Sequence, residues 1–249
     1  MSKRQKAARP PKKRASFKGV LWAAGGIFAV LLVMVSPIFE VRQVNVTGNT
    51  VVEEAAIRAA VGLDAKANMF AVLSYRAVSA LEAMPYIKSA KIVKTYPNTI
   101  DIAVVERKVC GYVEFARMNT YLLIDGEGMV LGTQTYLSEK LPVIVGLSFD
   151  DFAVGRRLET ENKDAFDTVV TLSNLFDKVG LEDVVKVDVS DNRDIHLYIR
   201  NVDVFFGGMD DADLKIQTLK VLAAELPPEA RGFLHMEDIS KDPIFQPLK

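Results

Sequence analysis

The spacing of hydrophobic and polar positions changes several times along the chain. From Gly19 to Phe39, a run of 21 residues carries no charged side chain. Beyond it, apolar residues recur at alternate positions in several short segments, which is typical of strands with one buried face. In other segments they recur every three or four positions, which is typical of amphipathic helices. The pattern predicts one apolar helix followed by an α+β fold.

The uncharged run, residues 19–39, is predicted to be a transmembrane helix. At about 1.5 Å per residue it spans roughly 30 Å, the thickness of a bilayer core. Ser36-Pro37 is suited to end this helix. A cleaved signal peptide would have a shorter apolar region and a small-residue cleavage site, so an uncleaved anchor is favoured. We assign the anchor to its large apolar side chains Trp22, Phe28, Leu31, Leu32 and Phe39, of which Trp22 suits the interface.

The charges are segregated along the chain. Residues 1–18 hold eight lysines or arginines and no acid, whereas the remainder carries 23 basic and 32 acidic side chains. The positive-inside rule predicts a cytoplasmic tail and an exported remainder, a single-pass type II topology in the cytoplasmic membrane. Binding of RNA or anionic lipid by the tail is an alternative. An acidic body argues against a nucleic-acid partner. The topology is assigned to the basic residues next to the helix, Lys12, Lys13, Arg14 and Lys18.

Residues 40–108 predict a small unit in the order strand, helix, helix, strand, strand. A capping-box pattern at Thr50-Val51-Val52-Glu53 predicts the start of a helix that ends at Gly62. A second helix is expected from about Ser74 to Pro85. The turn Tyr96-Pro97-Asn98-Thr99 separates two alternating segments. The strands are expected at residues 41–46, 90–93 and 100–105.

Residues 109–249 predict a larger mixed β domain with two helices. The segment Asp125-Gly126-Glu127-Gly128 between two apolar runs predicts a hairpin. The helices are expected at 163–179 and 211–226, with Pro227-Pro228 ending the second. Further strands are expected at residues 141–147, 185–189, 195–199, 202–206 and, as the last strand, 232–239.

Candidate catalytic chemistry is sparse in this sequence. His196 and His235 are the only histidines, and neither has metal-ligand spacing. We interpret His196 as a surface side chain and Cys110, the single cysteine, as a small buried apolar one. Acidic residues at 125–127 and 210–213 could suggest calcium, but turn and N-cap roles explain both. The sequence therefore assigns no catalytic, metal or cofactor-binding residue and predicts neither an enzyme nor a small-molecule substrate.

Several motifs carry a resemblance to a known family. Phe39-Glu40-Val41, with the strand that follows, resembles the opening of a POTRA domain beside a membrane anchor. The stretch from Met84-Pro85-Tyr86 through Pro97-Asn98-Thr99 to Glu106-Arg107 is similar to the FtsQ/DivIB family of bacterial cell-division proteins. Residues 123–130 resemble the first hairpin of the family's β domain, and residues 206–220 its late helix. The chain departs from the family where Tyr86 and Tyr96 stand in place of tryptophan and Val109 in place of proline.

The resemblance implies a POTRA domain at 40–108, an FtsQ/DivIB-type β domain at 109–249, and a non-enzymatic scaffold at the division septum. It implies that the protein binds small bitopic proteins of the FtsL and FtsB/DivIC types. Through them it would help to recruit and regulate septal peptidoglycan synthesis, with the septal transpeptidase and glycosyltransferase as further partners. The family associates the POTRA domain and anchor with septal recruitment, and the end of the β domain with partner binding.

We expect partner binding by β-augmentation, in which an extended segment pairs with an exposed terminal strand. The expected edge is residues 232–239. The alternative is that the last apolar side chains pack onto their own core. Phe245→Asp is expected to reduce partner capture and leave the thermal transition intact. The candidate partner-binding residues are Phe233, His235, Glu237, Ile239, Ile244 and Phe245, and membrane lipid is a further partner.

Two other functions stay open at this point. A POTRA-containing assembly or secretion factor is one, although an outer-membrane factor would need a long run of barrel strands after the POTRA unit. A membrane-anchored cell-wall enzyme is the other. It would need a nucleophile or metal constellation, which the sequence does not offer, and a concave pocket with convergent polar groups is the observation that would favour it.

Overall fold

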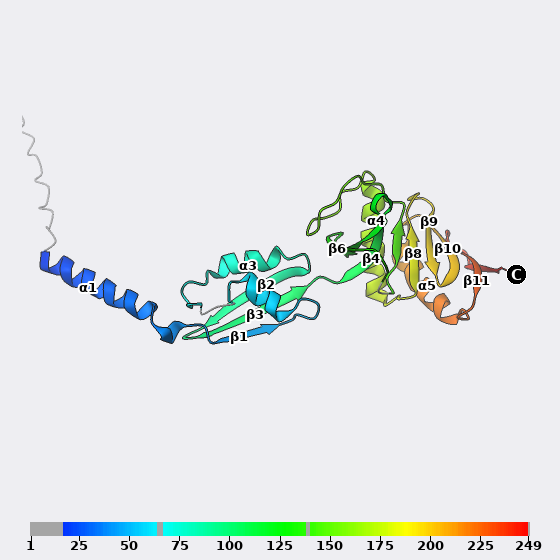
Figure 1. The fold of residues 1–249 in the computed structure, drawn as a ribbon. Coiled ribbons are helices and arrows are strands. Elements are labelled where there is room, and N and C mark those ends of the chain that lie inside the picture. The colour runs from blue at the N-terminus through cyan, green and yellow to red at the C-terminus, as the bar shows by residue number, and fades with distance from the viewer. Residues whose placement is uncertain (1–16, 64–66, 138–139, 249) are drawn as a thin grey trace, which may run out of the picture.

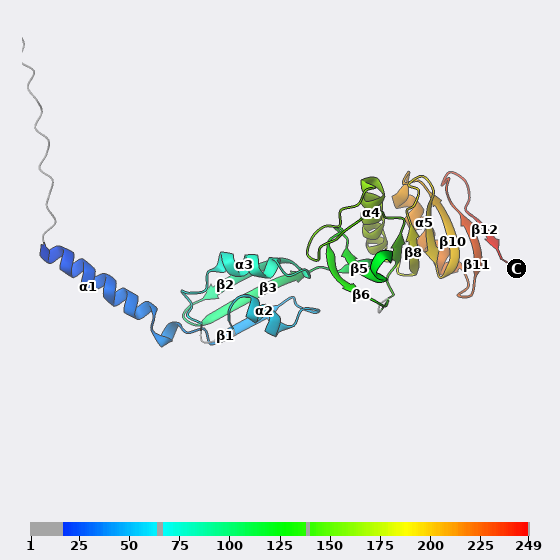
Figure 2. The same ribbon diagram turned by 45° about the horizontal axis from the view of Figure 1, so that its top comes forward.

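The computed structural model describes residues 17–63, 67–137 and 140–248. Helix α1 (Phe17–Met34) precedes a three-stranded sheet and then a nine-stranded sheet, and these parts follow one another along an extended molecule (Figures 1 and 2). The predicted α+β class is confirmed. Within the described residues, no helix combines the length and the apolar character that crossing a membrane requires.

The first domain has the predicted order of elements. It consists of β1 (Gln43–Thr47), α2 (Glu54–Ala60), α3 (Ser74–Glu82), β2 (Ile87–Thr95) and β3 (Thr99–Glu106). The central strand β3 pairs in parallel with β1 and antiparallel with β2. Its alternating residues Ile100, Ile102 and Val104 are buried in one cluster with Ile57 of α2 and Leu81 of α3. One sheet face is therefore covered by the two helices.

The second domain contains a nine-stranded mixed sheet with the two predicted helices, α4 (Lys163–Val179) and α5 (Ala212–Glu225). The order across the sheet is β12-β11-β10-β9-β8-β7-β4-β5-β6. Its strands are β4 (Val109–Phe115), β5 (Thr120–Asp125), β6 (Val130–Gln134), β7 (Val143–Val145), β8 (Val184–Asp188), β9 (Ile195–Ile199), β10 (Asn201–Gly207), β11 (Arg231–His235) and β12 (Ile244–Pro247). Short 3-10 helices occur at η1 (Pro37–Phe39) and η2 (Ala116–Met118).

The two faces of this sheet have different environments. One face packs against α4 and α5, in a core that includes Phe166, Leu172, Ile216 and Leu219 from the helices. The opposite face carries a smaller cluster at the β4–β6 end, centred on Tyr112, and more exposed residues at the β8–β12 end. Alternation along β9 to β11 separates the covered face from the open one.

Two strands were missed from sequence, and one was wrongly extended. β4 alternates poorly because Gly111, Tyr112 and Val113 are buried in succession. β12 lies between Pro243 and its own last residue, Pro247, and two prolines in so short a segment argue against a strand. The predicted last strand, 232–239, ends at His235. The expected strand at 141–147 is reduced to β7.

The predicted capping box is wrong. Helix α2 begins at Glu54, and its N-cap residue Glu53 makes no side-chain cap bond. The Thr50 hydroxyl and backbone N–H instead donate to the Glu106 carboxylate, at 2.5 and 2.9 Å. A carboxylate brought in from β3 therefore holds the loop before α2, which a pattern of neighbouring residues cannot show.

The predicted apolar span is longer than the helix that the structure shows. α1 ends at Met34, and Ser36 caps the short helix η1, which starts with Pro37. Phe39 belongs to the first domain instead, where it packs against that domain's core and against Phe70, with ring centroids 4.9 Å apart. Lys18 is exposed on α1. The other topology residues, Lys12, Lys13 and Arg14, lie outside the described residues.

Candidate partner-binding site

The terminal strand of the nine-stranded sheet is β12, not the predicted strand 232–239. β12 pairs antiparallel with β11, in the register Phe233↔Gln246 and His235↔Ile244, and so covers the edge that the sequence proposed as open. Among the described strands, β12 has a neighbour on one side only. The exposed edge is therefore displaced by one strand, onto the residues that were expected to lie just beyond it.

The backbone groups of β12 are unequally available to a partner. In an antiparallel pair, residues alternate between those bonded to the neighbouring strand and those that point away. The Leu248 N–H donates to the Arg231 carbonyl at 2.9 Å, so residues 244, 246 and 248 face β11. Phe245 and Pro247 point outward, with Pro243 next in the alternation. Because proline has no N–H, Phe245 alone of these three offers a donor, while all three offer carbonyls.

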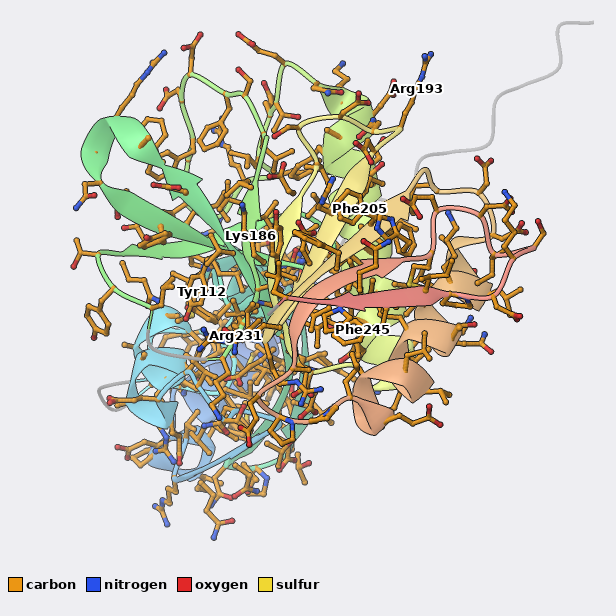
Figure 3. The ribbon with its side chains drawn as sticks, turned by 90° about the vertical axis from the view of Figure 1, so that its right-hand side faces the viewer. Tyr112, Lys186, Arg193, Phe205, Arg231 and Phe245 are labelled. Atoms are coloured by element: carbon orange, nitrogen blue, oxygen red, sulfur yellow. The ribbon has the colours of Figure 1, made fainter. Side chains whose placement is uncertain are left out.

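The six predicted partner-binding residues are divided between different environments. Ile244 is 59% exposed and lies on the open face beside His235. Phe245 and Ile239 are partly buried and pack against the domain core, as the alternative interpretation proposed for them. Figure 3 shows Phe245 on the α5 side of the end strand and Phe205 on the opposite side. The remaining three predicted residues lie on or just after β11: Phe233, His235 and Glu237.

An aromatic cluster on the open face adjoins this edge. Phe205 of β10 lies between two imidazoles, with ring centroids 4.5 Å from His196 and 4.6 Å from His235. Phe233 lies 5.9 Å from Phe205, and Tyr198 lies 6.4 Å from His196. We call these five residues the open-face cluster. The sequence pattern does not distinguish Phe205 or Tyr198 from other strand residues, although both occupy alternate positions of predicted strands.

The histidines of the open-face cluster are each held by an acid. His196 Nδ1 lies 2.8 Å from Asp203, and His235 Nδ1 lies 3.0 Å from Glu237. Burial opposes the charged form of His196, but the Asp203 carboxylate outweighs it, so the pKa of His196 is raised. Burial also opposes the charge of Glu237, and the hydrogen bond with His235 outweighs it, so the pKa of Glu237 is lowered. Each imidazole is therefore held in place by a neighbouring carboxylate.

The opposite end of the nine-stranded sheet is joined to the first domain by charged residues. Arg107 lies between β3 and β4, and its Nη1 donates to Asp125 at 2.6 Å and to Glu127 at 2.7 Å. Lys88 of β2 also contacts Glu127, at 2.7 Å. Asp125 accepts the backbone N–H groups of Glu127 and Met129, so its turn role is confirmed. The cationic groups that contact this acidic segment are therefore the side chains of Arg107 and Lys88.

Glu106, the neighbour of Arg107, ties β3 to the loop before α2. Its carboxylate accepts the backbone N–H groups of Thr50, Val51 and Val52 and the Thr50 hydroxyl. Burial opposes the charge of this carboxylate, but the Thr50 hydroxyl and the three backbone donors outweigh it and lower its pKa to about 2. The Glu106-Arg107 motif shared with the family therefore makes two different connections. Glu106 holds the loop before α2 to β3, and Arg107 holds the first domain to the second.

Other polar candidates make ordinary structural contacts. Asp211 occupies the expected N-cap position of α5, with φ 54°, but its side chain makes no cap bond. Cys110 is half-buried and not fully enclosed, with its Sγ 3.6 Å from the Lys108 carbonyl. The described residues contain no group of three or more His, Cys, Asp or Glu side chains placed to hold a metal.

A cavity of about 730 Å³ lies between loop 151–160 and the start of α4. Acidic and basic side chains both line it, and Arg157 contacts Asp167 at 2.8 Å while its guanidinium lies 5.1 Å from the centre of the Phe166 ring. The described lining contains no histidine, cysteine or serine. The enzyme alternative gains no support from this cavity.

Comparison with known proteins supports the resemblance. Residues 39–107 match the POTRA domain, FtsQ-type. The chain is 25% identical to "Cell division protein DivIB" of Clostridium botulinum (strain Hall) over 243 residues, covering 94% of this chain and 93% of the relative. It is 25% identical to DivIB of Clostridium acetobutylicum over 82% of each chain. "Cell division protein FtsQ" of Koribacter versatilis is 25% identical over 84% of this chain and 62% of its own length. The predicted resemblance to FtsQ/DivIB proteins is confirmed.

Proposed function

We propose that this chain, which carries an FtsQ-type POTRA domain and resembles DivIB and FtsQ over most of its length, is a non-enzymatic cell-division scaffold. It binds bitopic division proteins of the FtsB/DivIC and FtsL types and brings them to the septal peptidoglycan synthesis machinery, including its transpeptidase and glycosyltransferase. The supporting comparisons are the names and the long shared extent of the relatives.

The observation that carries the binding proposal is the open edge of β12. A partner segment in extended conformation pairs with Phe245, whose N–H and carbonyl both point outward. The carbonyls of Pro243 and Pro247 accept further bonds, but neither residue donates. Main-chain pairing is therefore short, and side chains supply the rest of the recognition.

Side-chain contacts on the open face complete the proposed site. Ile244 is exposed beside His235, and the open-face cluster continues inward from it across β10. A partner strand on β12 would place alternate side chains on this face. The prolines also limit unselective pairing, because an edge with few free donors is a poor template for other strands.

The proposal includes a single-pass anchor in the cytoplasmic membrane, with a cytoplasmic N-terminus, exported domains and a position at the septum. α1 has 18 residues, about 27 Å at the helical rise. The uncharged run from Gly19 to Phe39 and the exposure of Trp22, Phe28, Leu31 and Leu32 support it, because each of these four side chains is more than half exposed. An anchor would confine partners with their own spans to the same plane.

The test is co-purification of the full chain with co-expressed FtsB/DivIC-type and FtsL-type proteins. The informative variant is Ile244→Asp, because Ile244 is exposed. Phe245→Asp, the change suggested by sequence, would also disturb the core that Phe245 contacts. Val221→Asp on α5 is the matched control, since Val221 is also 59% exposed.

We expect Ile244→Asp to reduce partner recovery about tenfold and Val221→Asp to leave it unchanged. Equal recovery with both variants would reject the β12 site. Removing residues 244–249 strips β12 but also takes Phe245 from the core, so it should reduce recovery at least as much as Ile244→Asp, and only the point variant locates the site. Removing the last 18 residues would also delete Leu234 and Met236 from the core, so loss of binding there would not locate the site.

A further inference from the structure

The connection between α1 and the first domain is a hydrogen-bonded joint. The Asn68 side-chain amide donates to the Met34 carbonyl, the last residue of α1, at 2.9 Å. The Met69 N–H donates to the Phe39 carbonyl and the Val41 N–H to the Ala67 carbonyl, both at 2.8 Å. The loop before α3 therefore holds the C-terminal end of α1 against the domain.

Aromatic rings from three separate segments meet beside this joint. Phe70 lies 4.9 Å from Phe39 and 5.6 Å from Tyr96, measured between ring centroids. The N–H groups of Arg42 and Gln43 both donate to the Asn98 carbonyl, so the turn that follows Tyr96 adjoins the start of β1. Figure 2 shows α1 leaving the domain near the start of β1. The rings thus gather at the end of the domain that α1 enters.

Large apolar side chains at this same end are exposed. Val35 is 73% exposed, Ile38 61%, Tyr96 56% and Leu73 43%. We call these four residues, together with Phe70, the helix-proximal patch. Single exposed apolar residues are ordinary on a protein surface, but a group around the exit of an apolar helix indicates an apolar neighbour.

The charges at this end are compatible with lipid headgroups. Arg42 is exposed next to the Tyr96 turn, and Glu40 beside it is half-buried. The Lys94 ammonium is not free, because it donates to the Met69 and Val72 carbonyls. A tyrosine with an exposed ring and polar tip, next to an arginine, has the composition of a membrane–water interface.

We propose that the helix-proximal patch rests in the headgroup layer of the bilayer that holds α1. This inference rests on the proposed anchor. Its occupant is a lipid surface because the patch surrounds the carbonyl end of α1, and the Asn68–Met34 bond leaves little separation between the two. Contact at Ile38 and Tyr96 would fix the tilt of the first domain on the membrane and set the direction in which the second domain projects.

The test measures membrane depth with a nitroxide spin label on single cysteines in a Cys110→Ser background. The full chain is reconstituted in vesicles of phosphatidylethanolamine and phosphatidylglycerol. Tyr96→Cys reports the patch, and Tyr136→Cys, at a 68% exposed tyrosine of the second domain, is the matched control. Ile27→Cys reports α1, where Ile27 is 63% exposed. Accessibility to oxygen and to a water-soluble nickel chelate gives the depth.

The expected nickel accessibility at Tyr96 is severalfold below that at Tyr136, while Ile27 shows high oxygen and low nickel accessibility. Replacing both Ile38 and Leu73 with glutamate should raise the nickel accessibility of the label at Tyr96 toward that of the label at Tyr136. Equal values at Tyr96 and Tyr136, with Ile27 in lipid, would overturn the inference and leave the anchor intact. A water-exposed Ile27 would overturn the proposed anchor and this inference with it.

Discussion

The two ends of the nine-stranded sheet have opposite constructions. At the β4–β6 end, Tyr86 of the first domain packs against Tyr112, Leu123 and Leu131, and Arg107 bonds two acids. At the β12 end, a four-residue strand has exposed residues at three of its four positions and no described neighbour beyond it. The first end is joined to the first domain within the chain, whereas the second ends in a strand whose outer edge has no partner among the described strands.

The contrast separates a joint that stabilises the chain from an edge that we propose as a binding site. Arg107 and Asp125 are 12% and 5% exposed at their side chains, so each depends on the other. Ile244 is exposed, and its loss should cost little stability. Variants at the joined end are therefore expected to change global unfolding, and variants at the open end to change binding and local order.

The largest expected effect is that of Arg107→Ala. It leaves the buried Asp125 carboxylate without its cation, although two backbone N–H groups remain bonded to it. We expect a loss of about 3 kcal/mol in the free energy of unfolding, measured by urea titration of the detergent-solubilised chain. Arg117→Ala, which breaks an exposed pair with Asp150, should cost less than about 1 kcal/mol. Equal losses from Arg107→Ala and Arg117→Ala would show that the Arg107–Asp125 pair stabilises the fold no more than an exposed ion pair does.

Glu106 predicts an acid-sensitive junction at the same end. Its folded pKa of about 2 lies below the unfolded value of roughly 4.3. The stabilisation is therefore complete above about pH 5 and is lost as the pH falls toward 2. Between pH 5 and pH 2 the free energy of unfolding of the native chain should fall by about 2 kcal/mol more than that of Glu106→Gln. The measurement is the urea midpoint of each chain as a function of pH, and parallel profiles for the native chain and Glu106→Gln would contradict the prediction. Glu225→Gln, on the exposed side of α5, serves as the control.

Gly232→Ala should affect the open end alone. A Cβ at Gly232 would lie 2.2 Å from the Gln246 carbonyl oxygen, so β12 must shift away from β11. We expect the Gln246 amide to lose hydrogen-exchange protection, at a global cost of only about 1 kcal/mol. Partner capture should fall with it. Stronger capture would instead identify the uncovered β11 as the binding edge, as the sequence first suggested.

Pro247→Ala has the smallest expected effect, and it increases binding. The substitution adds an outward N–H to β12 and so one donor to a paired partner strand. One additional net hydrogen bond of about 1 kcal/mol corresponds to roughly fivefold tighter capture. Pro228→Ala, in the exposed turn after α5, is the control for general effects of removing a proline. Unchanged affinity would mean that the partner does not pair along this edge.

Local patterns predicted much of the architecture. Helix α4 was predicted at its observed bounds because its apolar spacing is regular, and the structure shows Asn162 and Gly180 at its caps. The order of elements in the first domain and the hairpin of β5 and β6 also followed from alternation and turn residues. β12 was missed because two prolines in a short segment outweigh a weak alternation.

The sequence by itself determined the local features of this protein: the apolar run, the separation of charge, the periodic helices and strands, and the motifs shared with FtsQ and DivIB. Each of these depends on residues that are close together in the chain. Only the tertiary structure decided that Glu106 caps the segment before α2 and that Arg107 joins two domains. It also decided that β12 covers β11 and moves the open edge to Phe245. These contacts join residues up to 56 positions apart, and their partners are selected by burial and register.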